Sequence, residues 1–181
     1  MKGSNDMSLL TIMQNRRSVR KYNSNPVTEK EINGVISAAL LAPNGKGQRP
    51  WEFVVIRNQD TLKELVNCRK GGAKMFESAN VAIAVYSDSE KTDTYTEDSS
   101  IAMTHMLLAA SELGLGAVWL QIRLRPSNED GISAEDFVNS RLGAPDNMKI
   151  EALLVMGHID EQPEPQKLPE FPSEKVHVEK W

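Results

Sequence analysis

The feature that most constrains this chain is a segment between residues 93 and 115 whose helical surface is apolar nearly all the way round. A helix with so little polar face is stable only when it is buried. We therefore expect it to form the central hydrophobic axis of the fold or the core of a subunit interface. Gly114 and Gly116 follow it, and glycines there predict a left-handed end of the helix. Its apolar positions are Ile101, Ala102, Met103, Met106, Leu107, Leu108, Ala109, Ala110 and Leu113.

The rest of the chain mixes helical and strand patterns without regular alternation. Apolar residues at helical spacing predict a helix near residues 9–13, and Thr28 with Glu31 predicts the capped start of a second helix. Short β-branched runs predict buried strands. The strands are expected at residues 53–56, 81–86, 117–122 and 152–156, with a short surface helix at 133–141. This order indicates an α+β or three-layer domain of sheet and helices.

A chain of 181 residues with 40% hydrophobic and 25% charged side chains predicts one globular domain. Its net charge of -4 provides no broad basic field, so we expect no nucleic-acid partner. The single cysteine, Cys68, cannot form an internal disulfide, and no apolar run reaches the length of a membrane span or a signal peptide. These features predict a protein of the reducing cytoplasm with no membrane partner.

The two ends of the chain differ from its middle. Residues 1–7 carry no periodic signal and are expected to be loosely ordered, which leaves residues 8–160 as the main domain. Prolines oppose a helix after residue 160, yet the tail holds more large apolar side chains than a disordered segment usually does. We predict an extended arm over residues 161–181 that contacts a partner subunit. An arm folded back on its own domain is an equal alternative.

A cluster of cations follows the first predicted helix, where Arg16, Arg17, Ser18 and Arg20 lie within five residues. Forked guanidinium groups beside a hydroxyl donor are suited to bind a phosphate. Alternatively, the same cations only offset the negative end of the dipole of the preceding helix. Taken alone, the cluster favours this second interpretation.

Three sequence blocks change that balance. They are residues 16–22 (RRSVRKY), 42–53 (APNGKGQRPWEF) and 113–120 (LGLGAVWL). In order and spacing they resemble the signature blocks of FMN-dependent nitroreductases, and residues 175–181 are similar to the C-terminal arm of short members of that family. The resemblance begins at about Leu9 and implies a nitroreductase-like three-layer fold. In that fold a central mixed or antiparallel sheet is flanked by helices, and two chains form an intertwined homodimer.

The resemblance also implies where FMN would bind. The arginine block would hold its phosphate and ribityl chain, the loop over residues 43–49 would come from the opposite subunit to border the flavin ring, and the segment after Gly114 would lie along the flavin. The residues so assigned to the cofactor are Arg16, Arg17, Ser18, Arg20, Pro43, Asn44, Gln48, Arg49, Leu115, Gly116 and Lys167. No residue is assigned as catalytic or as a metal ligand, because the flavin performs the chemistry.

Three residues depart from the family pattern. Gly47 stands where many members have Asn, Arg49 where Gln is usual, and His105 where an amide is common. Arginine donates hydrogen bonds but does not accept them, so Gln48 could take over the amide contact through a small register shift. If Arg49 is a cation beside the ring, it would favour the anionic reduced flavin, which predicts a shifted reduction potential of the flavin. We interpret His105 as a core histidine.

No competing catalytic signature accompanies these blocks, since the sequence lacks a G-x-S-x-G elbow, a P-loop and an H-E-x-x-H motif. We therefore expect an FMN oxidoreductase that passes electrons from NADH or NADPH to nitroaromatics, quinones or similar electron-poor acceptors by a ping-pong mechanism. One alternative is a flavin-binding or storage protein without efficient turnover. Another is a relative that acts as a dehalogenase or a heterocycle dehydrogenase. A phosphate-reading RNA or peptide module is opposed by the acidic charge balance.

Overall fold

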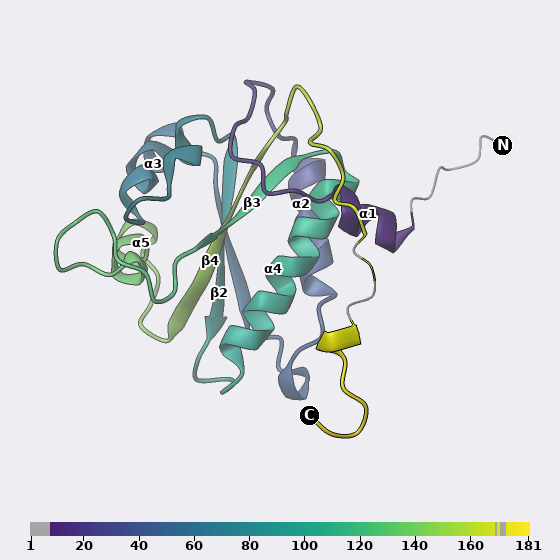
Figure 1. Ribbon diagram of the computed structural model, residues 1–181. Coiled ribbons are helices and arrows are strands. Elements are labelled where there is room, and N and C mark those ends of the chain that lie inside the picture. The colour runs from purple at the N-terminus through teal and green to yellow at the C-terminus, as the bar shows by residue number, and fades with distance from the viewer. Residues whose placement is uncertain (1–7, 169, 171–172) are drawn as a thin grey trace.

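The computed structural model describes residues 8–168, 170 and 173–181. Its centre is an antiparallel sheet in the order β1-β2-β4-β3 (Figure 1). The two middle strands are buried almost throughout, which is why their sequences are nearly continuous apolar runs. The strands agree with those expected from the sequence to within a few residues at their ends. They are β1 (Trp51–Ile56), β2 (Val81–Asp88), β3 (Gly116–Gln121) and β4 (Met148–Gly157).

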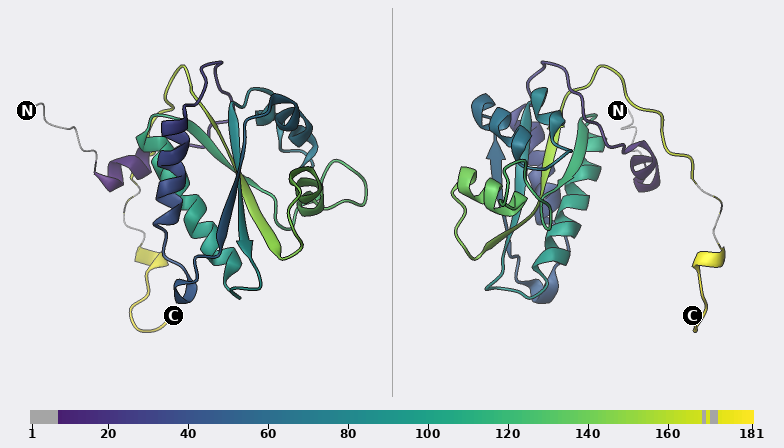
Figure 2. Two further views of the ribbon diagram at one scale, coloured as in Figure 1. Left: turned by 180° about the vertical axis from the view of Figure 1, so that it is seen from behind. Right: turned by 60° about the vertical axis from the view of Figure 1, so that its left-hand side comes forward.

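Helices cover both faces of the sheet, as the two views of Figure 2 show. One face carries α1 (Leu9–Asn15), α2 (Glu29–Leu40) and α4 (Tyr95–Glu112), and the other carries α3 (Gln59–Glu64) and α5 (Ala134–Leu142). Short 3-10 turns complete the structure, namely η1 (Gly45–Gly47), η2 (Leu65–Asn67), η3 (Lys74–Glu77) and η4 (Ser173–Lys175). The expected three-layer α+β fold is confirmed.

Alternation along the strands divides the apolar core between the two helical layers. In β2, Val81, Ile83 and Val85 face the layer of α2 and α4, whereas Ala82 and Ala84 face the opposite layer. This is the period of two that any extended strand imposes on its side chains. Each layer therefore has its own apolar cluster on the shared sheet.

Local capping explains where several helices begin. At the start of α2, the Thr28 hydroxyl accepts a hydrogen bond from the backbone N–H of Glu31 at 3.3 Å, and the Glu31 carboxylate accepts one from the backbone N–H of Thr28 at 2.7 Å. This reciprocal pair is the capping box expected from the sequence. Ser133 caps α5 in a similar way, by accepting a hydrogen bond from the N–H of Asp136 at 3.0 Å.

The longest helix, α4, was expected to be buried nearly all the way round, but within one chain it is buried on one side. Its inner side packs on the sheet through Met103, Met106 and Ala110, which are fully buried. Its outer side borders an apolar groove of about 610 Å³ that also touches α1 and α2. Neither α4 nor any other helix in the described ranges is both long and apolar enough to cross a membrane.

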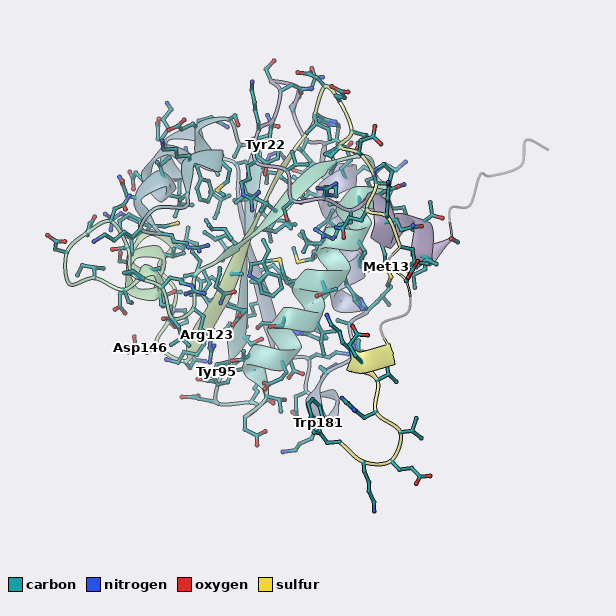
Figure 3. The ribbon with its side chains drawn as sticks, viewed as in Figure 1. Met13, Tyr22, Tyr95, Arg123, Asp146 and Trp181 are labelled. Carbon is teal, nitrogen blue, oxygen red and sulfur yellow. The ribbon has the colours of Figure 1, made fainter. Side chains whose placement is uncertain are left out.

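The beginning of the C-terminal arm lies against its own chain. The backbone N–H of Gln166 donates to the carbonyl oxygen of Gln14 at 2.8 Å, and the Gln162 side chain donates to the carbonyl oxygen of Gly114 at 2.8 Å. The far end stands off from the sheet, and Trp181 there is fully exposed (Figures 2 and 3). The arm is thus in cis at its start and uncovered at its end. The expectation of a loosely ordered N-terminus falls on residues 1–7, outside the described residues.

Cys68 provides a test of the core on the α3 side. It is fully buried, and this burial raises the pKa of its thiol to about 12, although the charge of Arg69 partly opposes the rise. The thiolate is the form that reacts, so we expect the native protein to resist a chromogenic disulfide reagent at mildly alkaline pH and to react fully once it is unfolded in guanidinium. Rapid labelling of the native protein would contradict the burial.

Candidate functional site

The arginine-rich segment leaves α1 in an extended conformation and runs along the open edge of β3. Ser18 forms an isolated parallel bridge with Ala117, and the backbone N–H of Val19 donates to the carbonyl oxygen of Ala117 at 3.0 Å. Side chains alternate along a regular extended chain, so Arg16, Ser18 and Arg20 are expected on the same side. These three residues are called the arginine row below. Within one chain Arg16 lines a small crevice beside Arg17, whereas Arg20 lines a larger cavity.

Arg17 has a different place in this segment. Its guanidinium donates a hydrogen bond of 2.6 Å to the carbonyl oxygen of Glu164 at the start of the C-terminal arm. Together with Arg16, Gln162 and Pro163, it lines a crevice of only about 10 Å³, which is too small for a ligand. The side chain of Arg17 therefore ties the arm to the segment.

Tyr22 anchors the end of the same segment to the sheet (Figure 3). Its hydroxyl lies 2.8 Å from the carbonyl oxygen of Val19 and 2.9 Å from that of Val155, so it can donate to either. Burial raises the pKa of this hydroxyl, and the nearby Arg20 charge only partly offsets that effect, so the group stays a donor. At Gly157 an added Cβ would lie 2.8 Å from Tyr22 Cβ, which shows how closely the ring approaches β4.

An open cavity of about 730 Å³ begins where the row ends. Four cations border it, namely Arg20, Lys21, Arg69 and Lys74, against the single carboxylate of Glu77. Within the part of the chain that the structure describes, none of the four takes part in an ion pair. The cavity therefore carries a surplus of positive charge and suits an anionic ligand.

Of these four cations, the sequence pattern assigned only Arg20 to a site. Arg69 and Lys74 enclose a glycine-rich turn between η2 and η3, in which Gly71 has a positive φ of 73°. The signal that could have found them is the composition of residues 69–74, where cations stand on both sides of a Gly-Gly pair in a short turn. Only the folded chain shows that this turn faces Arg20.

The loop over residues 43–49 lies at the other end of α4 (Figure 1). The backbone N–H of Gly45 donates to Asp98 Oδ1 in the first turn of α4 at 2.8 Å, whereas Arg16 lies beside Ser111 in its last turn. A rise of 1.5 Å per residue places these two turns about 20 Å apart. Within one chain, Pro43, Asn44, Gln48 and Arg49 are therefore not brought together with the arginine row.

The two glycines after α4 have structural roles within their own chain. Gly114 ends the helix with a positive φ of 75°, as expected. A Cβ added to Gly116 would lie 2.5 Å from Ile159 Cγ2 and 2.9 Å from Val19 Cγ1, so the glycine lets the arginine segment approach β3. Leu115 is buried in the core beside it. Contacts of Leu115 and Gly116 with a cofactor stay a prediction.

Lys167 lies at the same end of the molecule as the arginine row. It is exposed and directly follows Gln166, whose side chain donates a hydrogen bond of 3.4 Å to the carbonyl oxygen of Arg16. Its expected contribution to a phosphate site is compatible with this place. In the described ranges, no three His, Cys, Asp or Glu side chains are grouped to hold a metal ion.

Comparison with known proteins identifies the family. The family model described as "Nitroreductase family" matches residues 13–68 and 62–158. A protein of Methanothermobacter thermautotrophicus named "Putative NADH dehydrogenase/NAD(P)H nitroreductase" is 34% identical over 178 residues, which cover 97% of this chain and 88% of the relative. The solved structure of an FMN-dependent nitroreductase from Clostridium difficile R20291 has a TM-score of 0.89 at 36% identity and covers 95% of this chain and 99% of that one. The chain is a member of the nitroreductase family.

Proposed function

We propose that the protein is an FMN-dependent oxidoreductase that passes electrons from NADH or NADPH to small electron-poor acceptors such as nitroaromatics and quinones. The observation that carries this proposal is the cavity lined by Arg20, Lys21, Arg69 and Lys74, next to the segment that also carries Arg16 and Ser18. Membership of the nitroreductase family supports it, as do the names of the two relatives, one of which includes NAD(P)H and the other FMN.

The residues present fit FMN in charge and in size. A phosphate monoester carries a charge between about -1.5 and -2 near neutral pH, and guanidinium and hydroxyl donors are its usual partners. Arg16, Ser18 and Arg20 would hold this phosphate, with Lys167 from the arm. The cavity of about 730 Å³ falls in the range of small-molecule sites, and Lys74 would add positive charge along it. When bound, the flavin supplies the redox chemistry, and the chain binds and orients it.

A homodimer would complete the site. The loop over residues 43–49 cannot reach the arginine row of its own chain, but a two-fold axis across α4 would turn a second copy end for end and bring its loop to that row. The apolar groove on α4 offers a surface for this contact, since Leu9, Met13 and Leu41 beside it are 60%, 45% and 81% exposed. The uncovered end of the arm, including Trp181, would lie on the same partner.

The cavity is open, so bound FMN would stay accessible, and the donor and the acceptor would reach it in turn. This arrangement is the expected basis of a ping-pong mechanism with a broad choice of acceptor. An anaerobic titration of the yellow holoprotein with NADH or NADPH tests it. We expect the flavin absorbance to bleach and then to recover when a nitrofuran or a quinone is added. A flavin that stays oxidised would indicate a storage protein, and turnover of a halogenated phenol alone would indicate a dehalogenase.

Sedimentation velocity tests the dimer independently. We expect the holoprotein to sediment as two copies of the 20.1 kDa chain. A monomer that keeps its FMN would contradict a site built from two chains.

A further inference from the structure

The loop between α2 and β1 has an unusual backbone. Three of its residues adopt a positive φ, namely Lys46 at 53°, Gly47 at 67° and Arg49 at 47°. Two of them carry side chains, and for such residues the left-handed conformation costs about 1–2 kcal/mol each. Strain of this kind persists only where the surrounding structure holds it in place. Contacts within the loop and with its neighbours must therefore hold its shape.

Asp98, in the first turn of α4, holds this loop. It is only 2% exposed, its Oδ1 accepts a hydrogen bond from the backbone N–H of Gly45 at 2.8 Å, and its Oδ2 accepts one from the Thr94 hydroxyl at 3.1 Å. Its carbonyl oxygen accepts a third from Trp51 Nε1 at 3.0 Å. No Lys, Arg or His of the described residues forms an ion pair with it. Asp98 Oδ1 thus joins the loop to the helix, and Oδ2 is held by Thr94 at the N-cap of the same helix.

The loop packs closely against the start of α4 at Gly45. A Cβ added to Gly45 would overlap the hydroxyl group of Thr94 and would lie 3.7 Å from Asp98 Oδ2. Inside the loop, Asn44 Oδ1 accepts a hydrogen bond from the backbone N–H of Arg49 at 2.8 Å. The backbone at Arg49 is therefore fixed by Asn44 directly and by Asp98 through Gly45.

The loop carries two cations, and only one of them forms an ion pair among the described residues. Lys46 forms an ion pair with Asp93 at 3.6 Å, whereas exposed Arg49 takes part in none among the described residues. We propose that Asp98 is a positioning residue. It holds the strained loop so that the Arg49 guanidinium lies beside the flavin of the partner subunit, and this guanidinium raises the reduction potential of that flavin. A nearby cation has this effect because reduction adds negative charge to the ring. This inference rests on the proposed function.

Spectroelectrochemical titration of the holoprotein tests it. We expect Arg49→Gln and Asp98→Ala each to lower the potential by the equivalent of a tenfold change in the ratio of reduced to oxidised flavin, about 30 mV for a two-electron couple. The double variant should match the single ones, because Asp98 acts through Arg49. Lys46→Gln is the matched control. It removes the neighbouring loop cation, which is already paired at the surface, and should leave the potential unchanged.

A second variant tests the same contact without removing a buried carboxylate, in case Asp98→Ala fails to fold. In Gly45→Ala the added methyl group displaces the loop from Thr94, and the potential should fall as in Arg49→Gln. Hydrogen exchange in the flavin-free protein provides another measurement. The amide of Gly45 should exchange slowly in the wild type and at least tenfold faster in Asp98→Ala.

The inference is overturned if Asp98→Ala and Gly45→Ala keep the wild-type potential while Arg49→Gln lowers it. It is also overturned if Arg49→Gln changes nothing, or if the double variant shows the sum of two separate shifts. These results leave the proposed function standing. The proposed function fails instead, and the inference with it, if the wild-type protein binds no FMN, is monomeric, or holds a flavin that neither NADH nor NADPH reduces.

Discussion

Replacing Arg16 and Arg20 together by alanine is expected to weaken FMN binding at least a hundredfold. The two guanidinium groups belong to the arginine row and are not involved in ion pairs within the described chain. A hydrogen bond to a charged group contributes about 1.5–3 kcal/mol, so two lost bonds cost about 3–6 kcal/mol, and each 1.4 kcal/mol is a factor of ten.

Quenching of FMN fluorescence by the apoprotein measures this affinity. Arg17→Ala is the matched control from the same segment, because its guanidinium already donates to the carbonyl oxygen of Glu164. We expect this control to change the affinity less than tenfold. If the double variant bound FMN as the wild type does, the phosphate would lie elsewhere. An equal loss in Arg17→Ala would show that the amount of charge matters and its placement does not.

Gly116→Ala is expected to destabilise the fold by about 2–3 kcal/mol, a large part of the total stability of a domain this size. The new methyl group would meet Ile159 Cγ2 at 2.5 Å and Val19 Cγ1 at 2.9 Å. Either the strand edge must open or the arginine segment must move away from β3. The substitution should therefore also weaken FMN binding, although Gly116 need not touch the cofactor.

Urea unfolding followed by circular dichroism measures this loss. Gly72→Ala is a suitable control, because its Cβ would meet Arg69 Nε at 3.5 Å, an ordinary contact distance. We expect the control to stay within about 0.5 kcal/mol of the wild type. If Gly116→Ala were equally mild, β3 and the arginine segment would pack less closely than the structure shows.

Much of the fold could be predicted because its signals are local. The apolar run of β2, the capping box of Thr28 and Glu31, and the apolar surface of α4 each depend on residues within one element. Residues 57–80 gave no such signal, and they fold into α3 and two 3-10 turns. The side chain of Asn58 starts α3 by accepting from two backbone N–H groups at 3.0 Å, a contact that a lone Asn in a loop does not reveal.

The sequence could predict the parts of the candidate site whose residues lie close together in the chain. It could not predict contacts between distant segments. Arg16, Ser18 and Arg20 could be assigned together because they lie within five residues, whereas the hydrogen bond from Arg17 to Glu164 joins positions far apart in the chain. The approach of Lys74 to Arg20 likewise depends on the packed fold. No pattern in the sequence states that the 43–49 loop and the arginine row lie at opposite ends of α4.

That separation along α4 has a genetic consequence. If each chain lends its loop to the other, a copy lacking the row of arginines and a copy lacking a working loop are both inactive alone. Mixed together, they would assemble pairs with one pocket damaged on both sides and one pocket entirely sound. Co-expressing two such dead alleles should therefore restore part of the activity, with about half of the pockets in each mixed pair able to hold flavin.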